Sequence, residues 1–163
     1  MSSSNRSHSV RLACVLLLLA GCSEKKAPSS GGSFEPQALA TITLPIAGKS
    51  FTLQVADDVT KREKGLMFVT SMPADSGMIF VFPAAEPRSF WMKNTPIDLD
   101  IIYLGANRKV VSVHTMKANT LDGIDSGGDA QYAIELNRGV AGQLKLSVGQ
   151  VVDVPGDLLG KAR

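Results

Sequence analysis

The strongest constraint on the fold is an alternation of apolar and polar side chains, with a period of two residues, in short segments of the chain. Residues 41–46 and 51–56 alternate in this way on either side of Gly48-Lys49, which predicts a hairpin. Successive side chains of a strand point to opposite faces, so these segments predict strands with one buried face. Further strands are predicted at residues 78–82, 99–104, 110–114, 132–136 and 151–154.

Helix signals are few. Asp58 is a candidate N-cap for a helix over residues 59–67, and a short helical turn is predicted at residues 140–144. Many short strands, few helices and frequent glycine and proline predict a mainly β domain with one or two short helices. Both a β-sandwich and a partly closed barrel fit this pattern.

The first residues predict a lipoprotein signal. Arg6 and Arg11 precede an apolar run, residues 12–20, which is far shorter than the roughly 20 residues of a membrane span. The run ends on Leu19-Ala20-Gly21-Cys22, with small residues before the cysteine, which resembles a bacterial lipoprotein signal. The resemblance implies that residues 1–21 are removed and that Cys22 is acylated. Several fatty chains on one residue would anchor the protein firmly, whereas a single chain binds only marginally.

The mature chain is predicted to have a tether and one domain. Residues 22–38 are small and polar and contain several glycines and prolines, so they predict a flexible tether that follows the lipidated cysteine. Residues 39–163 form the single β-rich domain. We therefore expect a bacterial cell-envelope protein that faces the periplasm, with the membrane as a partner through the lipid anchor. Ser23 after the cysteine favours the outer membrane over the inner one.

Cysteine and charge content exclude several classes of function. Cys14 lies in the predicted leader and Cys22 would carry lipid, so no thiol is left for a disulfide, a nucleophile or a thiolate metal site. Loss of Arg6 and Arg11 with the leader makes basic and acidic residues equal in number. This balance gives no electrostatic reason for nucleic-acid binding.

The richest segment of the chain is Ser-Phe-Trp-Met-Lys-Asn-Thr-Pro-Ile-Asp-Leu-Asp-Ile-Ile-Tyr, residues 89–103. Together with residues 63–67, 77–82 and 133–139, it resembles the family known as domain of unknown function 192 (DUF192). The resemblance implies a compact, mostly β domain that is often exported or membrane-anchored, and it implies no agreed activity. One departure is the turn at residues 105–108, which lacks the usual acidic residue followed by glycine and puts Arg108 at an expected left-handed position.

This segment, together with Arg88 just before it, provides candidate ligand-binding residues. Trp91 offers a stacking face, Arg88 and Lys93 offer positive charge, and Asn94 and Asp100 offer polar groups. The alternative is structural. Asn94-Thr95-Pro96 is a good turn sequence, and Trp91 and Met92 could simply fill the core.

A second hypothesis is acid–base or metal chemistry. Asp98 and Asp100 share one strand face by their spacing, and His114 lies on the predicted partner strand. The length of the hairpin loop decides whether His114 joins them, and the sequence leaves this register open. With Glu135 or Asp125 nearby, these three residues could form a His–carboxylate catalytic site or a hard-cation site. The alternative is a solvated strand face.

Taken together, the residues favour a small-ligand-binding or accessory module at the cell envelope over an enzyme. A hydrolase-like or metal-dependent enzyme that uses Asp98, Asp100 and His114 is the first alternative, and a structural or protein-docking domain is the second. A small molecule or an envelope protein is the expected further partner. The sequence assigns no cofactor and no metal.

Overall fold

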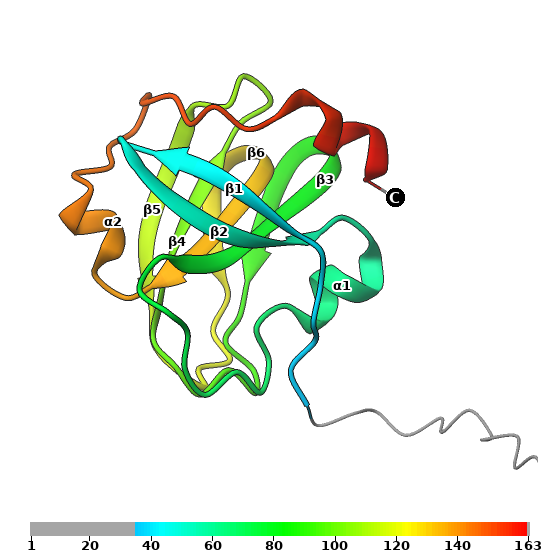
Figure 1. Ribbon diagram of the computed structural model, residues 1–163, viewed down its shortest axis with the longest axis vertical. Coiled ribbons are helices and arrows are strands. Elements are labelled where there is room, and N and C mark those ends of the chain that lie inside the picture. Colours follow the sequence, from blue (N-terminus) through cyan, green and yellow to red (C-terminus); the bar gives the residue numbers. More distant parts are fainter. Residues whose placement is uncertain (1–34, 163) are drawn as a thin grey trace, which may run out of the picture. The chain divides into compact units, whose positions relative to one another are not determined.

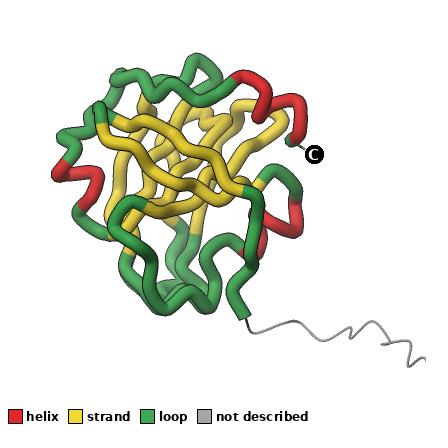
Figure 2. Tube along the Cα trace, viewed as in Figure 1, coloured by secondary structure: helices red, strands yellow, loops and turns green. Residues whose placement is uncertain are grey.

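The computed structural model describes residues 35–162, so the predicted leader, Cys22 and most of the predicted tether lie outside the described residues. Figures 1 and 2 show a β-rich domain with short helices at its periphery. In chain order the elements are β1 (Thr41–Ile46), β2 (Lys49–Ala56), α1 (Val59–Lys64), β3 (Ser76–Phe90), β4 (Leu99–Leu104), β5 (Val110–Met116), β6 (Ile124–Asn137), α2 (Val140–Gln143) and the 3₁₀ helix η1 (Gly156–Lys161). The mainly β fold with short helices is confirmed. Within residues 35–162 no helix has the length and apolar character needed to cross a bilayer.

The strands form one mixed sheet in the order β1-β2-β3-β6-β4-β5. Only β2 and β3 run parallel among the paired strands that are described, and the other pairs are antiparallel. The sheet is strongly curved but open, with β1 and β5 at its edges (Figure 1). It is therefore a single sheet and not the two packed sheets of a sandwich.

Two predicted strands are much longer than their sequence signals. Residues 78–82 and 132–136 are the inner halves of β3 and β6, which continue to Phe90 and back to Ile124. Pro83 and Pro87 interrupt the pattern of β3, and the register of the β3–β6 pair shifts near both of them. Proline is tolerated in a strand at such irregularities, where its missing N–H costs no ladder hydrogen bond.

Three local predictions had different outcomes. The helix predicted to reach residue 67 ends at Lys64, because Gly65 adopts φ 48° and stops it. The strand predicted at residues 151–154 is wrong, because only an isolated bridge between Lys109 and Val151 is present there. Arg108 does occupy the left-handed region, with φ 61°.

Buried residues cover both faces of the central strands. One core cluster lies under the segment that follows β6, which contributes Val140, Val152 and Leu158. The other lies under the β2–β3 and β3–β4 connections, which contribute Leu66 and Met92. The second face carries the site described next.

The parallel β2–β3 pair requires a crossover, and residues 57–75 with α1 provide it. The Asp58 carboxylate accepts a hydrogen bond from the Lys61 backbone N–H at 2.9 Å and caps α1. The Gln37 amide donates to the carbonyls of Lys61 and Gly65 at 2.8 and 2.9 Å, so it satisfies carbonyls at the C-terminal end of α1. These contacts fix the two ends of α1, and Arg62 joins the helix to β3 by donating to the Val81 carbonyl.

Candidate functional site

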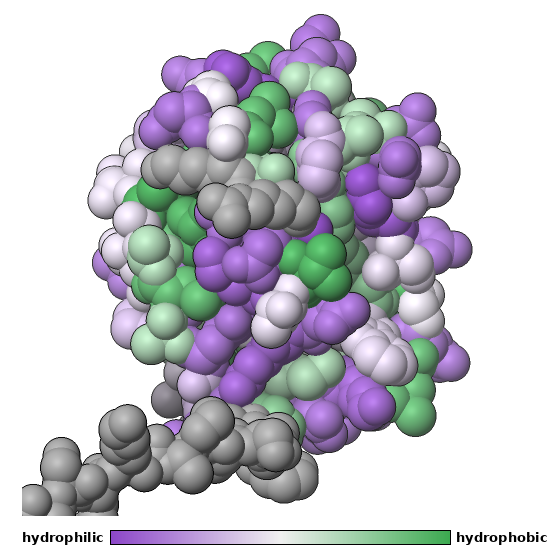
Figure 3. All heavy atoms as spheres, turned by 90° about the vertical axis from the view of Figure 1, so that its right-hand side faces the viewer, coloured by the Kyte–Doolittle hydropathy of each residue, from purple (hydrophilic) through white to green (hydrophobic). Residues whose placement is uncertain are grey.

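A groove of about 290 Å³ lies between α1 and the outer part of β3. Its lining residues are Val59, Arg62, Glu63, Phe82, Ser89, Phe90 and Trp91. The side of the domain that carries α1 faces the viewer in Figure 3, where apolar patches alternate with hydrophilic groups. A concave surface with aromatic walls and a few charged groups is typical of a small-ligand site.

Trp91 stands at the wall of this groove and is half exposed, at 50%. Its neighbour Met92 is buried, at 1% exposure, in the second core cluster. The core-packing alternative is therefore correct for Met92 and wrong for Trp91. The Lys93 ammonium lies 5.0 Å from the centroid of the Trp91 ring, so a cation covers part of the indole.

A narrow pocket continues from the groove into the domain. It shares Arg62, Glu63, Phe90 and Trp91 with the groove and is further lined by Lys64, Gly65, Leu66, Met67, Phe80, Lys93, Thr95 and Glu135. Its volume of about 30 Å³ is comparable to that of one water molecule. Glu135 is therefore connected to the groove through a water-sized space.

The Glu135 side chain is the unusual group in this pocket. It is only 4% exposed and lines the narrow pocket. Burial raises the pKa of Glu135 to about 8. Residues 130–136 of β6 are all buried, so both faces of the strand are covered there and the Glu135 carboxyl group is largely removed from water. An ionisable group of this kind in a cleft indicates a functional site.

Tyr103 and His114 lie on the same face of the sheet as Glu135. Burial, together with the charges of Glu135 and Asp125, raises the pKa of the Tyr103 phenol, whose O–H donates to the Ile124 carbonyl at 2.6 Å. The Tyr103 and His114 rings meet edge to face at 6.2 Å, and His114 Nε2 is buried without a hydrogen-bond partner in the described part of the chain. Tyr103 belongs to the second core cluster, and His114 packs against its ring.

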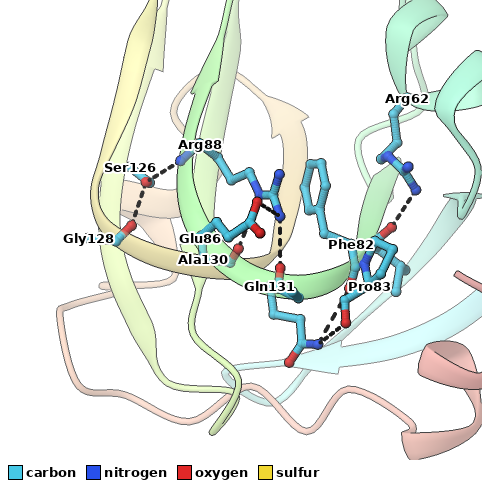
Figure 4. A network of polar contacts seen from close by, with 11 residues as sticks. Arg62, Phe82, Pro83, Glu86, Arg88, Ser126, Gly128, Ala130 and Gln131 are labelled. Atoms are coloured by element: carbon cyan, nitrogen blue, oxygen red, sulfur yellow. Dashed lines mark hydrogen bonds and ion pairs between the residues drawn. The ribbon is translucent and has the colours of Figure 1, made fainter. Parts of the chain in front are cut away.

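Two arginines lie against the Phe82 ring (Figure 4). The Arg88 and Arg62 guanidinium carbons are 4.1 and 5.1 Å from the ring centroid. Arg88 also donates to the Ala84 carbonyl and pairs with Glu86 at 3.2 Å, whereas Arg62 donates to the Val81 carbonyl at 2.9 Å. Burial, and then the charge of Arg88, lowers the pKa of Arg62. Arg62 lines the groove, and Arg88 supports the Phe82 wall instead of lining it.

Asn94 has a structural position. It is exposed and adopts φ 56°, and its carbonyl accepts a hydrogen bond from the Phe68 N–H at 2.7 Å. This contact joins the β2–β3 connection to the β3–β4 connection. The turn interpretation of residues 94–96 describes it well, while Asn94 is not among the residues that line the groove.

The candidate trio Asp98, Asp100 and His114 does not converge. Asp100 is opposite Thr115 in the β4–β5 ladder, and His114 is opposite Ile101, so His114 and Asp100 point to opposite faces of the sheet. The register left open by the sequence is thus settled against a shared site. Among residues 35–162 there is also no group of three histidine, cysteine or acidic side chains arranged to hold a metal.

The two aspartates instead hold backbone segments in place. The Asp100 carboxylate is 2% exposed and accepts hydrogen bonds from the Thr115 hydroxyl and the Ala141 N–H, both at 2.9 Å. Asp98 accepts from the Ala118 N–H at 2.8 Å and from Arg138 at 2.7 Å, and these hydrogen bonds lower the pKa of Asp98.

The sequence selected Trp91 and Lys93 as ligand-binding candidates, and the structure places Trp91 in the groove and Lys93 in the narrow pocket. The sequence did not select Arg62, Glu63 or the pocket position of Glu135. Glu135 alternates with Ile134 and Leu136, which is the pattern of a residue on a solvated face. The apolar residues Ala130 and Ala133 belong to the same core cluster, and their presence in the strand indicates that the face that carries Glu135 is also covered.

Comparison with known proteins agrees with this open-sheet β domain. The family model DUF192, described as an uncharacterised ACR, matches residues 42–154, and the chain therefore belongs to this family. No curated protein matches the chain.

Two crystal structures are similar. One is a protein from Sinorhizobium meliloti 1021, provisionally described as a transcription regulator. It is 29% identical, with a TM-score of 0.63, and the match covers 75% of this chain and 97% of that one. The other is a protein of unknown function from Novosphingobium aromaticivorans DSM 12444. It is 27% identical, with a TM-score of 0.64, and the match covers 78% of this chain and 90% of that one.

Proposed function

We propose that this domain is a small-ligand-binding module, and that a lipid on Cys22 holds it at the bacterial cell envelope, facing the periplasm. The observation that supports binding is the groove beside the half-exposed Trp91, which continues into the pocket that reaches Glu135. An aromatic ring of this size in a groove offers a large contact area to a ligand.

Binding is favoured over catalysis by Asp98, Asp100 and His114, because Asp100 and His114 point to opposite faces of the sheet. The two carboxylates are also occupied by backbone N–H groups, by a threonine and by an arginine. Regulation of transcription, suggested for the Sinorhizobium protein, gains no support from a chain whose predicted mature form has equal numbers of basic and acidic residues.

The binding proposal is tested by titration of the full-length chain, purified in a non-ionic detergent, with sugars, short peptides, lipid head groups and small organic acids and amines. Trp91 is the only tryptophan, so its fluorescence reports directly on the groove. We expect at least one class to give a saturable change and a matching calorimetric signal. The Trp91→Ala variant should weaken this binding at least tenfold by calorimetry.

Leu121→Ala is the matched control, because Leu121 is another exposed apolar residue, at 68%, and lies outside the groove. Its affinity should equal that of the wild type. Equal weakening in both variants, or no saturable binding by any class, contradicts the proposal.

The envelope location rests on the signal-like segment that ends at Cys22. Mass spectrometry of the protein from its native host should find residue 22 as an acylated N-terminus. An intact leader, or an unmodified thiol at Cys22, contradicts the proposed anchor.

A further inference from the structure

Building on the proposed function, we propose that the ligand is a small organic anion with an aromatic or apolar body, bound with its anionic group between Lys93 and the Glu135 carboxyl group. The aromatic groove holds the body of the ligand, and one oxygen of its anionic group enters the water-sized pocket. Binding of this anion would then be coupled to retention or uptake of one proton by Glu135.

The body of the ligand is inferred from the groove walls. Phe82, Phe90 and Trp91 supply three aromatic rings, and Val59 adds an aliphatic contact. Phe90 and Phe82 meet edge to face at 6.3 Å, and Arg62 and Arg88 hold Phe82, so this wall is preorganised. A rigid aromatic wall favours a flat or apolar group and lowers the ordering cost of binding.

The charge of the ligand is inferred from the pocket between the groove and Glu135. Arg62, Lys64 and Lys93 line it together with a single exposed acid, Glu63. The Lys93 ammonium contacts the Trp91 ring and has no carboxylate partner among residues 35–162. The Lys93 ammonium at this small opening attracts an anion and disfavours an amine.

Glu135 completes the site because a neutral carboxyl group can donate a hydrogen bond. The charged or titratable groups around it come from several elements: Arg62, Glu63 and Lys64 from α1, Lys93 from the β3–β4 connection, and Tyr103 from β4. Met78 is its partner on β3, and Asp125 lies further along β6. Burial already keeps Glu135 protonated at neutral pH, and its pKa is raised to about 8.

A bound carboxylate would reinforce that state. The negative charge of the ligand disfavours ionisation of Glu135, and the O–H of Glu135 can donate a hydrogen bond to the ligand oxygen. No bond other than hydrogen bonds forms, and the proton comes from solvent when binding occurs above about pH 8. A cation or a donor-only group would instead face the acidic O–H and the three basic side chains.

The test uses the full-length chain in non-ionic detergent and three probes that share a phenyl body: phenylacetate, phenylacetamide and phenethylamine. We expect phenylacetate to bind at least tenfold more tightly than the other two at pH 7. Its affinity should fall by about tenfold per pH unit above about pH 8, where Glu135 loses its proton. Calorimetry in two buffers of different ionisation enthalpy should show proton uptake there that approaches one per ligand.

The Glu135→Gln variant separates the role of the proton from the role of shape. A glutamine stays neutral and can still donate, so phenylacetate should bind with an affinity that is independent of pH and with no proton uptake. Asp129→Asn is the matched control, because Asp129 is an exposed acid on the same strand and lines neither the groove nor the pocket. That variant should keep the pH dependence of the wild type.

Tighter Trp91-dependent binding of the amide or the amine overturns the inferred anion but leaves the binding function standing. A wild-type affinity for phenylacetate that does not change with pH overturns the role of Glu135. No saturable binding of phenylacetate also overturns the inference, whereas binding of another class in the broad titration would still support the proposed function.

Discussion

The buried carboxylate of Asp100 accepts a hydrogen bond from the backbone N–H of Ala141, 41 residues later in the chain, at 2.9 Å. The contact joins strand β4 to the first residues of α2, which has no side-chain cap of its own. A residue that the sequence suggests for a ligand site is therefore an anchor for the segment after β6.

Replacement of Asp100 by asparagine should lower the free energy of unfolding by about 1–3 kcal/mol, because a neutral amide replaces the charged carboxylate that accepts from both Thr115 and Ala141. Urea unfolding measures this loss. Asp129→Asn, on an exposed position of β6, is the control and should change stability by less than about 0.5 kcal/mol. Ligand binding at Trp91 should be unchanged in both variants. A loss of binding in Asp100→Asn alone would mean that Asp100 takes part in ligand binding.

Glu135 should make the domain less stable as the pH rises. Its ordinary pKa is 4.5, and burial raises it to about 8 in the folded protein. Between these values the unfolded chain has released the proton while the folded chain retains it, so folded-state stability falls by about 1.4 kcal/mol per pH unit. Below this window both states are protonated, and above it both are ionised, so Glu135 adds no slope there.

Urea unfolding at a series of pH values from 4 to 9 checks this slope. Glu135→Gln should remove it, so that the variant gains stability relative to the wild type as the pH rises toward 8. The lowered pKa values of Asp58 and Asp98 act in the opposite direction, but only at acidic pH, below their ordinary value of 3.8. Parallel curves for the two proteins would show that Glu135 titrates normally.

The two guanidinium groups on Phe82 should contribute measurably to the stability of the domain. Phe82→Leu keeps an apolar side chain but removes the ring, and should cost about 1–2 kcal/mol. A double-mutant cycle with Arg88→Gln measures the contact itself by unfolding. We expect a coupling of about 0.5–1 kcal/mol. Simple additivity of the two changes would mean that the stacking contributes nothing.

Gly77 should be intolerant of any side chain, because an added Cβ would lie 2.2 Å from the Glu135 carbonyl oxygen in the paired strand β6. Gly77→Ala should therefore destabilise the domain by about 3 kcal/mol and displace Glu135. Gly142→Ala is the matched control, because its Cβ would meet no atom within 4 Å and it lies within α2. That change should be neutral or slightly stabilising in thermal unfolding, since alanine favours helix.

Much of the sheet follows from local sequence. The alternation in residues 41–46 and 51–56 predicts β1 and β2 because each has one face in the core. The outer halves of β3 and β6 were not predictable, because Pro83 and Pro87 break the pattern, and only pairing between distant segments keeps the chain extended there. The parallel β2–β3 pairing likewise depends on tertiary contacts that the sequence does not show.

The site was predictable only in part, for a similar reason. An aromatic residue beside a lysine at positions 91 and 93 suggests a binding surface from composition alone. The position of Arg62 and Glu135 beside them depends on the crossover of α1 and on the central place of β6 in the sheet. Neither follows from residue spacing, because the groups are more than 25 residues apart in the chain.

The crossover at residues 57–75 is held at both ends by the parallel pair β2–β3, and it also supplies Val59, Arg62 and Glu63 to the groove. Surface connections tolerate changes in length and composition far better than the ladders that flank them. One side of the proposed binding surface could therefore change in sequence and length without loss of the hydrogen-bonded framework. Exchange of this single segment between homologous domains would test whether it sets the selectivity of the proposed ligand site.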